Sequence, residues 1–200
     1  MSVNPTDLTA LLVAISFAAG LNVYAAVGSL GLLARFHVLT LPPTLGLLTN
    51  WYIIGICLAL FVVEFFADKI PAFDLVWNAL HTFVRIPVAA FLAYHATSNL
   101  PLWEQLAATA AGSAIALAAH GGKIAVRAAV TSSPEPFSNS ALSLAEDGFV
   151  VFLMWFAAKH PYWSTVIVAA ALLVIIMLLR WVVRAMRNLF VEAEQVVVGS

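Results

Sequence analysis

The sequence predicts an all-α fold, a polytopic membrane helix bundle with about six transmembrane helices. Composition is the first reason, because 63% of the 200 residues are hydrophobic and only 10% are charged. Soluble domains are roughly 45–50% apolar and about 25% charged. The mean hydropathy of +0.99 agrees with a protein that lies in a membrane. A series of apolar runs and an internal repeat are the other two reasons.

Six apolar runs follow one another along the chain. They cover residues 8–35, 51–67, 75–96, 104–130, 148–158 and 163–190. A transmembrane helix needs about 20 apolar residues, so the second and fifth runs are short. Each is preceded by a Pro-containing connector, residues 37–50 and residues 131–147, that we expect to be re-entrant-like. Because irregular backbone at membrane depth needs polar partners, these connectors should lie inside the bundle.

Two similar heptapeptides divide the chain into halves. FFADKIP at residues 65–71 and WFAAKHP at residues 155–161 share Phe, Ala, Lys and Pro in the same register. Aligning them pairs the second run with the fifth and the third run with the sixth. This pairing predicts two inverted three-helix repeats, since a tandem unit with an odd number of spans enters the membrane from opposite sides. The repeats would be residues 1–96 and 97–190, followed by a C-terminal tail, residues 191–200. The alternative is that interface chemistry alone produced two similar loop ends.

Cations near the ends of the runs predict the orientation in the membrane. The side that holds both termini has Lys69, Lys123, Arg127, Arg180, Arg184 and Arg187, and the other side has Arg35 and Lys159. By the positive-inside rule, both termini are expected to be cytoplasmic. Arg180, Arg184 and Arg187 follow an apolar run at helical spacing, and we expect them to contact anionic lipid headgroups.

The third apolar run has a polar face. Asp74, Asn78, His81 and Arg85 fall within about 60° of one helix face. A charge at bilayer depth costs about 2.5 kcal/mol or more. Arg85 lies about 15 Å along the helix from Asp74, too far for its side chain to reach the interface easily. Arg85 is therefore expected to have a partner inside the bundle.

The fourth run carries a longer polar stripe. It is formed by Gln105, Thr109, Ser113, His120, Lys123 and Arg127. The stripe is about 33 Å long at helical rise, close to the full hydrocarbon thickness. The alternative is that the two cations lie at the membrane boundary and that the hydroxyl groups bond back to their own helix.

Acidic partners for these bases are present at the short runs. Glu64 and Asp68 lie on one helix face, and Glu146 and Asp147 follow Ser143. Carboxylates at a helix start could also act through the helix dipole, most simply at Asp74. We predict one charged substrate or ion site near mid-membrane. Its candidate residues are Glu64, Asp68, Asp74, His81, Arg85, His120, Lys123, Arg127, Ser143, Glu146 and Asp147.

Two segments with these residues resemble a family of bacterial membrane proteins, domain of unknown function family 4126. They are VEFFADKIPAFDLVWNALHTFVRIPVAA, residues 63–90, and HGGKIAVRAAVTSSPEPFSNSALSLAEDG, residues 120–148. The likeness covers nearly the whole chain, beginning with AAGLNVYAAVGSLGLLAR at residues 18–35. The resemblance implies a polytopic protein of a bacterial cytoplasmic membrane. It implies no activity.

The function that these features favour is a small transporter or channel for a small ion or polar solute, with its site between the repeats. Arg85, Lys123 and Arg127 suit an anion, whereas the four carboxylates suit a cation or a proton. His81 and His120 could shuttle protons near neutral pH.

Two other classes stay open. In a structural or lipid-binding accessory protein the same charges would neutralise one another and fix helix packing. A membrane-embedded enzyme would use the histidines and carboxylates as a metal or acid–base site, but the sequence has no HExxH helix or Walker loop. The sequence therefore favours a function without catalysis, and it identifies no cofactor. A net charge of −1 argues against nucleic acid, and many Ala and Gly residues would allow a homo-oligomer in the lipid bilayer.

Overall fold

A computed structural model gives the structure of the protein and describes residues 5–131 and 136–198. The described chain is entirely helical, with no strand in either range. The elements in order are α1 (Pro5–Leu21), α2 (Val23–Arg35), the 3₁₀ helix η1 (Pro43–Thr49), α3 (Trp51–Ala67), α4 (Pro71–Ala96), α5 (Leu102–Thr131), α6 (Pro136–Lys159) and α7 (Pro161–Val198). The predicted all-α class is confirmed.

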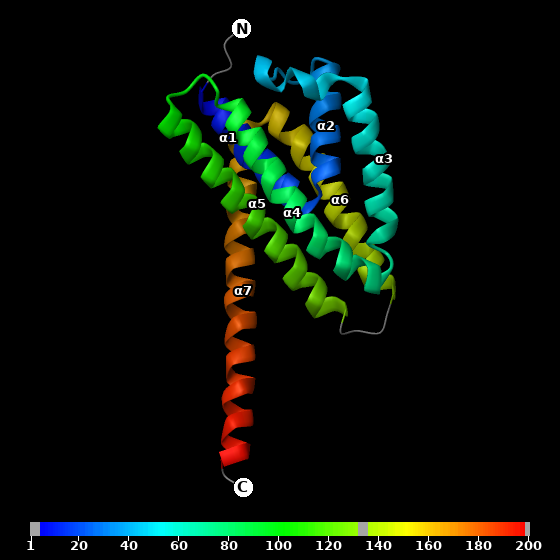
Figure 1. Ribbon diagram of the computed structural model, residues 1–200, viewed down its shortest axis with the longest axis vertical. Coiled ribbons are helices and arrows are strands. Elements are labelled where there is room, and N and C mark those ends of the chain that lie inside the picture. Colours follow the sequence, from blue (N-terminus) through cyan, green and yellow to red (C-terminus); the bar gives the residue numbers. More distant parts are fainter. Residues whose placement is uncertain (1–4, 132–135, 199–200) are drawn as a thin grey trace.

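The first apolar run is not one helix, and the prediction of a continuous span over residues 8–35 is wrong. The helix stops at Leu21 because Asn22 has an extended backbone, with φ −148° and ψ 103°. The side-chain oxygen of Asn22 accepts a hydrogen bond from the Ala25 N–H at 2.9 Å and so caps α2. In Figure 1, α1 descends to the middle of the bundle and α2 returns to the end from which α1 started. The two helices form a hairpin whose tip, Asn22, is fully buried.

The two Pro-containing connectors also differ from expectation. The first forms η1 at one end of the bundle, beside the ends of α2 and α3 (Figure 1), at 61° to α3. The second connector is largely helical, because α6 begins at Pro136 and continues to Lys159. The fifth run is therefore not short, and the polar residues before it belong to the same helix. This helix can accommodate them because Ser143 and Asp147 face the interior of the bundle.

Fewer helices are suited to cross a membrane than the sequence predicts. Within the described ranges, three are long and apolar enough: Val76–Ala96, Ser140–Lys159 and Pro161–Trp181. The bent pair of η1 and α3 would make a fourth. The hairpin of α1 and α2 lies among the longer helices and supplies much of the core through small residues such as Ala14, Ala18 and Ala26. Six full spans are not confirmed.

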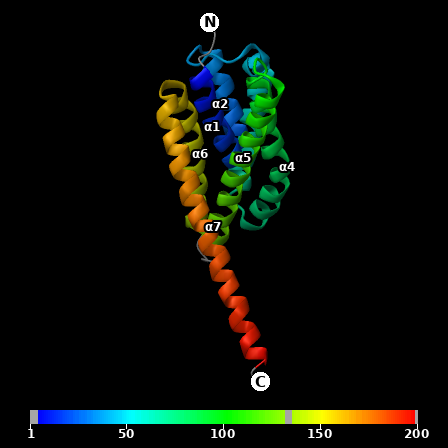
Figure 2. The same cartoon turned by 90° about the vertical axis from the view of Figure 1, so that its left-hand side faces the viewer.

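The beginning of α1 and the end of α7 lie at opposite ends of the molecule (Figures 1 and 2). Six full spans would bring the chain back to the side on which it began, and the reversal at Asn22 is the reason that it does not return. Figure 2 shows that the second half of α7 extends past the rest of the bundle. The apolar part of this helix ends near Trp181.

The close approach of α1 to α5 provides a test of this arrangement. A Cβ atom added at Gly20 would lie 2.8 Å from Ala119 Cβ and would also overlap the carbonyl oxygen of Ala116. We expect Gly20→Ala to lower the free energy of unfolding by about 1–3 kcal/mol, since overpacking forces the helices apart. Thermal unfolding in detergent measures this effect. Gly121→Ala on α5 is the control, because its Cβ would meet no atom within 4 Å, and equal melting temperatures for both variants would contradict the packing.

Candidate functional site

Seven charged side chains gather beneath the tip of the α1–α2 hairpin. This charged cluster consists of Glu64 and Asp68 at the end of α3, Arg85 in α4, Lys123 and Arg127 in α5, and Glu146 and Asp147 in α6. Six of the seven residues are at most 4% exposed. Glu146, with a side chain that is 11% exposed, lies at the edge. The cluster therefore joins four helices within an otherwise apolar bundle.

Arg85 is the member of the cluster that α4 contributes, and it contacts Glu64 and His120. Its Nη2 atom forms an ion pair with Oε1 of Glu64, and both side chains are fully buried. Its Nη1 atom donates to Nδ1 of His120 at 2.8 Å. Because Arg85 can only donate, the remaining ring nitrogen of His120 carries the proton and donates to Thr82 Oγ1 at 2.7 Å. His120 is thus a neutral hydrogen-bonding partner of the arginine.

Lys123 lies at the centre of the cluster. Its Nζ atom is 3.2 Å from Asp68 Oδ2, 3.3 Å from Glu146 Oε2 and 3.7 Å from Glu64 Oε1. The same ammonium group donates to the main-chain carbonyl of Leu21 at 3.2 Å. Leu21 is the last residue of α1, where carbonyl groups lack a partner within the helix and the helix dipole is negative. Lys123 therefore stabilises the hairpin tip and three carboxylates together.

Arg127 joins the same carboxylates from one turn further along α5. Its Nη2 atom lies 2.8 Å from Asp68 Oδ2 and 2.7 Å from Glu146 Oε2. Ser143 adds a long hydrogen bond of 3.4 Å to Asp68 Oδ2. Lys123 and Arg127 are therefore both buried and paired with carboxylates, as expected of cations that face the inside of the bundle.

Asp147 is attached to the cluster differently from the other acids. Its Oδ1 atom accepts a hydrogen bond from Nδ2 of Asn22 at 2.8 Å, which connects α6 to the hairpin tip. No lysine or arginine lies within 4 Å of its carboxylate in the described part of the chain. Sequence reasoning did not include Asn22 or Leu21. An asparagine inside an apolar run was the available signal for Asn22, but the carbonyl of Leu21 gave none.

The remaining predicted residues lie apart from the ion pairs. His81 accepts from the Tyr24 hydroxyl at 3.0 Å through Nε2 and donates to the Trp77 carbonyl at 2.8 Å through Nδ1. The Asp74 side chain lies outside the described residues. On α5, the Thr109 and Ser113 hydroxyls donate to main-chain carbonyls four residues earlier, as the alternative interpretation expected.

Lys69 follows α3 and lies within electrostatic range of Asp147 and Asp68. Its ammonium group donates to the Phe65 carbonyl at 3.0 Å. Partial burial lowers the pKa of this group. In the described residues, no group of three or more His, Cys, Asp and Glu side chains is arranged to hold a metal ion.

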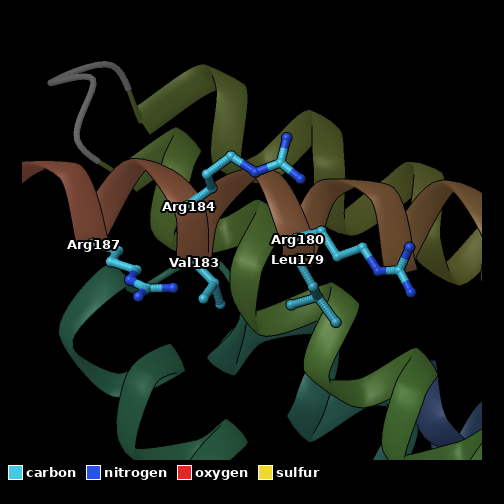
Figure 3. A pocket seen from close by; sticks show the side chains of 5 residues that line it. All are labelled: Leu179, Arg180, Val183, Arg184 and Arg187. Carbon is cyan, nitrogen blue, oxygen red and sulfur yellow. The ribbon is translucent and has the colours of Figure 1, made fainter.

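The three arginines of α7 form a separate feature. They line a shallow pocket on the part of α7 that leaves the bundle, together with two apolar side chains: Leu179, Arg180, Val183, Arg184 and Arg187. Figure 3 shows the guanidinium groups spread along the outside of the helix. All three arginines are exposed. They are therefore free to meet an anionic surface.

Comparison with protein families identifies the family of the chain. Residues 9–181 match the model of a family described as "Domain of unknown function (DUF4126)". The chain belongs to this family. The match includes the hairpin, the whole charged cluster and the apolar part of α7. Searches of curated proteins and of solved structures give no match, so the family's chemistry must be argued from the site itself.

The ion pair between Arg85 and Glu64 predicts a coupled effect on stability. We expect Arg85→Met to lower the free energy of unfolding by about 3–5 kcal/mol, because Glu64 would remain buried with its charge. Adding Glu64→Gln should recover part of this loss, and a double-mutant cycle on melting temperatures measures the recovery. Arg35→Met is the matched control, since Arg35 is exposed and contacts the Trp51 ring. Additive effects of the two substitutions would contradict a coupled pair.

Proposed function

We propose that the protein is a small membrane transporter that carries a small ion or polar solute past the charged cluster. The observation that carries this proposal is the position of the cluster at the tip of a broken helical hairpin. Helices that end within a membrane protein direct main-chain carbonyl and N–H groups at a bound solute or ion. Here the end of α1 and the beginning of α2 face Lys123 and Asp147.

Incomplete pairing of the cluster supports a binding role. Oε2 of Glu64 and Oδ2 of Asp147 are buried and have no hydrogen-bond partner among the described residues. Native proteins leave few buried polar atoms without partners, and the exceptions often lie at functional sites. A network that served packing alone would gain from satisfying both carboxylate atoms.

The two heptapeptides support an inverted arrangement of the second and third helices of each half. FFADKIP joins α3 to α4, and WFAAKHP joins α6 to α7; Pro71 and Pro161 are the first residues of the following helices. In Figure 1, α3 and α6 run in opposite directions, as do α4 and α7. The hairpin of α1 and α2 has no such counterpart, because α5 is unbroken. If the halves share an origin, the first element of each has diverged.

A structural role is the second candidate. It is favoured by the close pairing of Arg85, Lys123 and Arg127, each of which has a carboxylate partner. Buried pairs of this kind can fix helix packing without binding a solute. Measurement of ion flux in proteoliposomes separates transport from a structural role.

We infer a cytoplasmic position, in a bacterial cytoplasmic membrane, for the end of the bundle that carries the exposed arginines of α7. Lys69 lies at the same end, and the positive-inside rule places such groups in the cytoplasm. Arg180, Arg184 and Arg187 would then contact anionic headgroups. Because α1 begins at the opposite end (Figure 1), we revise the expectation for the N-terminal side and place it outside.

Cysteine labelling tests this orientation. In a Cys57→Ala background, which removes the one native cysteine, a membrane-impermeant maleimide should label Ser98→Cys in intact cells. It should label Arg187→Cys only after permeabilisation, because the turn after α4 and the end of α7 lie at opposite ends of the bundle. Labelling of both positions from the same side would contradict the proposed orientation.

Flux into proteoliposomes tests the function. Vesicles with the purified protein and gradients of phosphate, chloride, sodium or potassium should show saturable uptake of at least one ion. Glu146→Gln keeps the side-chain volume but removes a charge that Lys123 and Arg127 share. We expect it to lower uptake at least about tenfold, which corresponds to about 1.4 kcal/mol of barrier.

The control for this experiment is Glu104→Gln in the first turn of α5, remote from the cluster. It should retain uptake. If the folded wild-type protein carries none of these ions, the structural role replaces the transport proposal.

A further inference from the structure

The charged cluster has one more acid than it has bases. Its four carboxylates are Glu64, Asp68, Glu146 and Asp147, and its three bases are Arg85, Lys123 and Arg127. Three of the carboxylates have a base within 4 Å, whereas Asp147 has none among the described residues. An uncompensated charge in a dry interior is costly. Asp147 is therefore the member of the cluster that most needs a further positive charge.

The contacts of Asp147 suit a carboxylic acid that carries a proton. Its Oδ1 atom accepts from Asn22, as a carbonyl oxygen does, while its buried Oδ2 atom has no partner in the described ranges. Asn22 cannot rotate its amide, since its oxygen already accepts from the Ala25 N–H at 2.9 Å. The amide nitrogen is thus fixed as a donor to Asp147.

The groups around Asp147 do not supply a counter-ion. Glu64 and Asp68 on α3 are negative, and Lys123 on α5 is shared among three other carboxylates. Lys69, after α3, bonds to a main-chain carbonyl. Tyr24 on α2 is neutral and bonds to His81.

A metal cation fits the position less well than a proton. Hard cations take six or more oxygen ligands, whereas Asp147 itself offers one carboxylate atom without a partner, and the described residues contain no group of three ligand side chains. A proton needs only that one oxygen atom.

We propose that Asp147 is a reversible proton-binding residue, and that its proton couples to solute movement. The coupling role rests on the proposed transport function. The proton adds to Oδ2 and leaves the Asn22 contact at Oδ1 in place, so that the cluster becomes electrically balanced. Loss of the proton creates an unpaired negative charge directly beneath the hairpin tip. The charge then favours a rearrangement of α1 and α2 relative to α6.

Infrared difference spectroscopy of the purified, full-length protein tests proton binding without reference to transport. Titration from about pH 4 to about pH 9 should show the protonated carboxyl C=O band of a buried acid, which disappears as the proton is lost at higher pH. Asp147→Asn should remove this band, and Glu104→Gln in the first turn of α5, remote from the cluster, should retain it. Asn22→Ala should shift its frequency, because the hydrogen bond to Oδ1 is lost. This variant keeps the test decisive should Asp147→Asn fail to fold.

A band that is absent from the wild-type protein, or that remains in Asp147→Asn, would overturn the assignment. Coupling is tested separately in proteoliposomes, where an imposed pH gradient should change uptake by the wild-type protein but not by Asp147→Asn. If the Asp147 band is present but no solute moves, proton binding stands, and both the transport proposal and the coupling role are overturned. If solute moves but Asp147 stays ionised, transport stands and the coupling role is overturned. The same conclusion follows if the pH gradient does not change uptake by the wild-type protein.

Discussion

The arrangement of this protein depends on the pairing of buried charges. Arg85, Glu64 and Asp68 are fully buried, and Lys123 is nearly so. An isolated charge in such surroundings would cost several kcal/mol, but opposite charges in contact offset much of that cost. Because the members come from α3, α4, α5 and α6, their pairing determines how these four helices are placed. The cluster therefore constrains the fold and offers the site in the same place.

The hairpin of α1 and α2 follows from the same constraint. A helix that ends in the middle of a bundle exposes carbonyl groups at one end and N–H groups at the other, and each needs a partner. Lys123 supplies a donor to the Leu21 carbonyl, while Asn22 caps α2 with its own side chain. The charges that join α3, α4, α5 and α6 therefore also stabilise the break between α1 and α2. A second consequence is geometric, since the reversal leaves the beginning of α1 at the opposite end of the molecule from the end of α7.

The candidate site was partly accessible to sequence reasoning. Arginine and lysine residues on polar helix faces needed acidic partners, and the acids at the ends of neighbouring apolar runs were available. Which partners meet could not be predicted: Lys123 contacts three carboxylates, whereas the hydrogen bond of Asp147 among the described residues is to Asn22. The polar residues of the second connector were expected in an irregular, re-entrant-like segment because the connector contains proline. In the structure, Ser143 and Asp147 lie within a regular helix whose polar face is buried.

The sequence by itself determined the all-helical class, the apolar character and the presence of buried charges that must pair. These properties depend on composition and on spacing within a single helix, which local chemistry controls. Only the tertiary structure decided that residues 8–35 reverse at Asn22, because one capping side chain can either interrupt a helix or lie within it. It also decided which of the four acids has no basic partner within 4 Å among the described residues. That outcome depends on distances between side chains of different helices, and the spacing of residues along the sequence does not specify these distances.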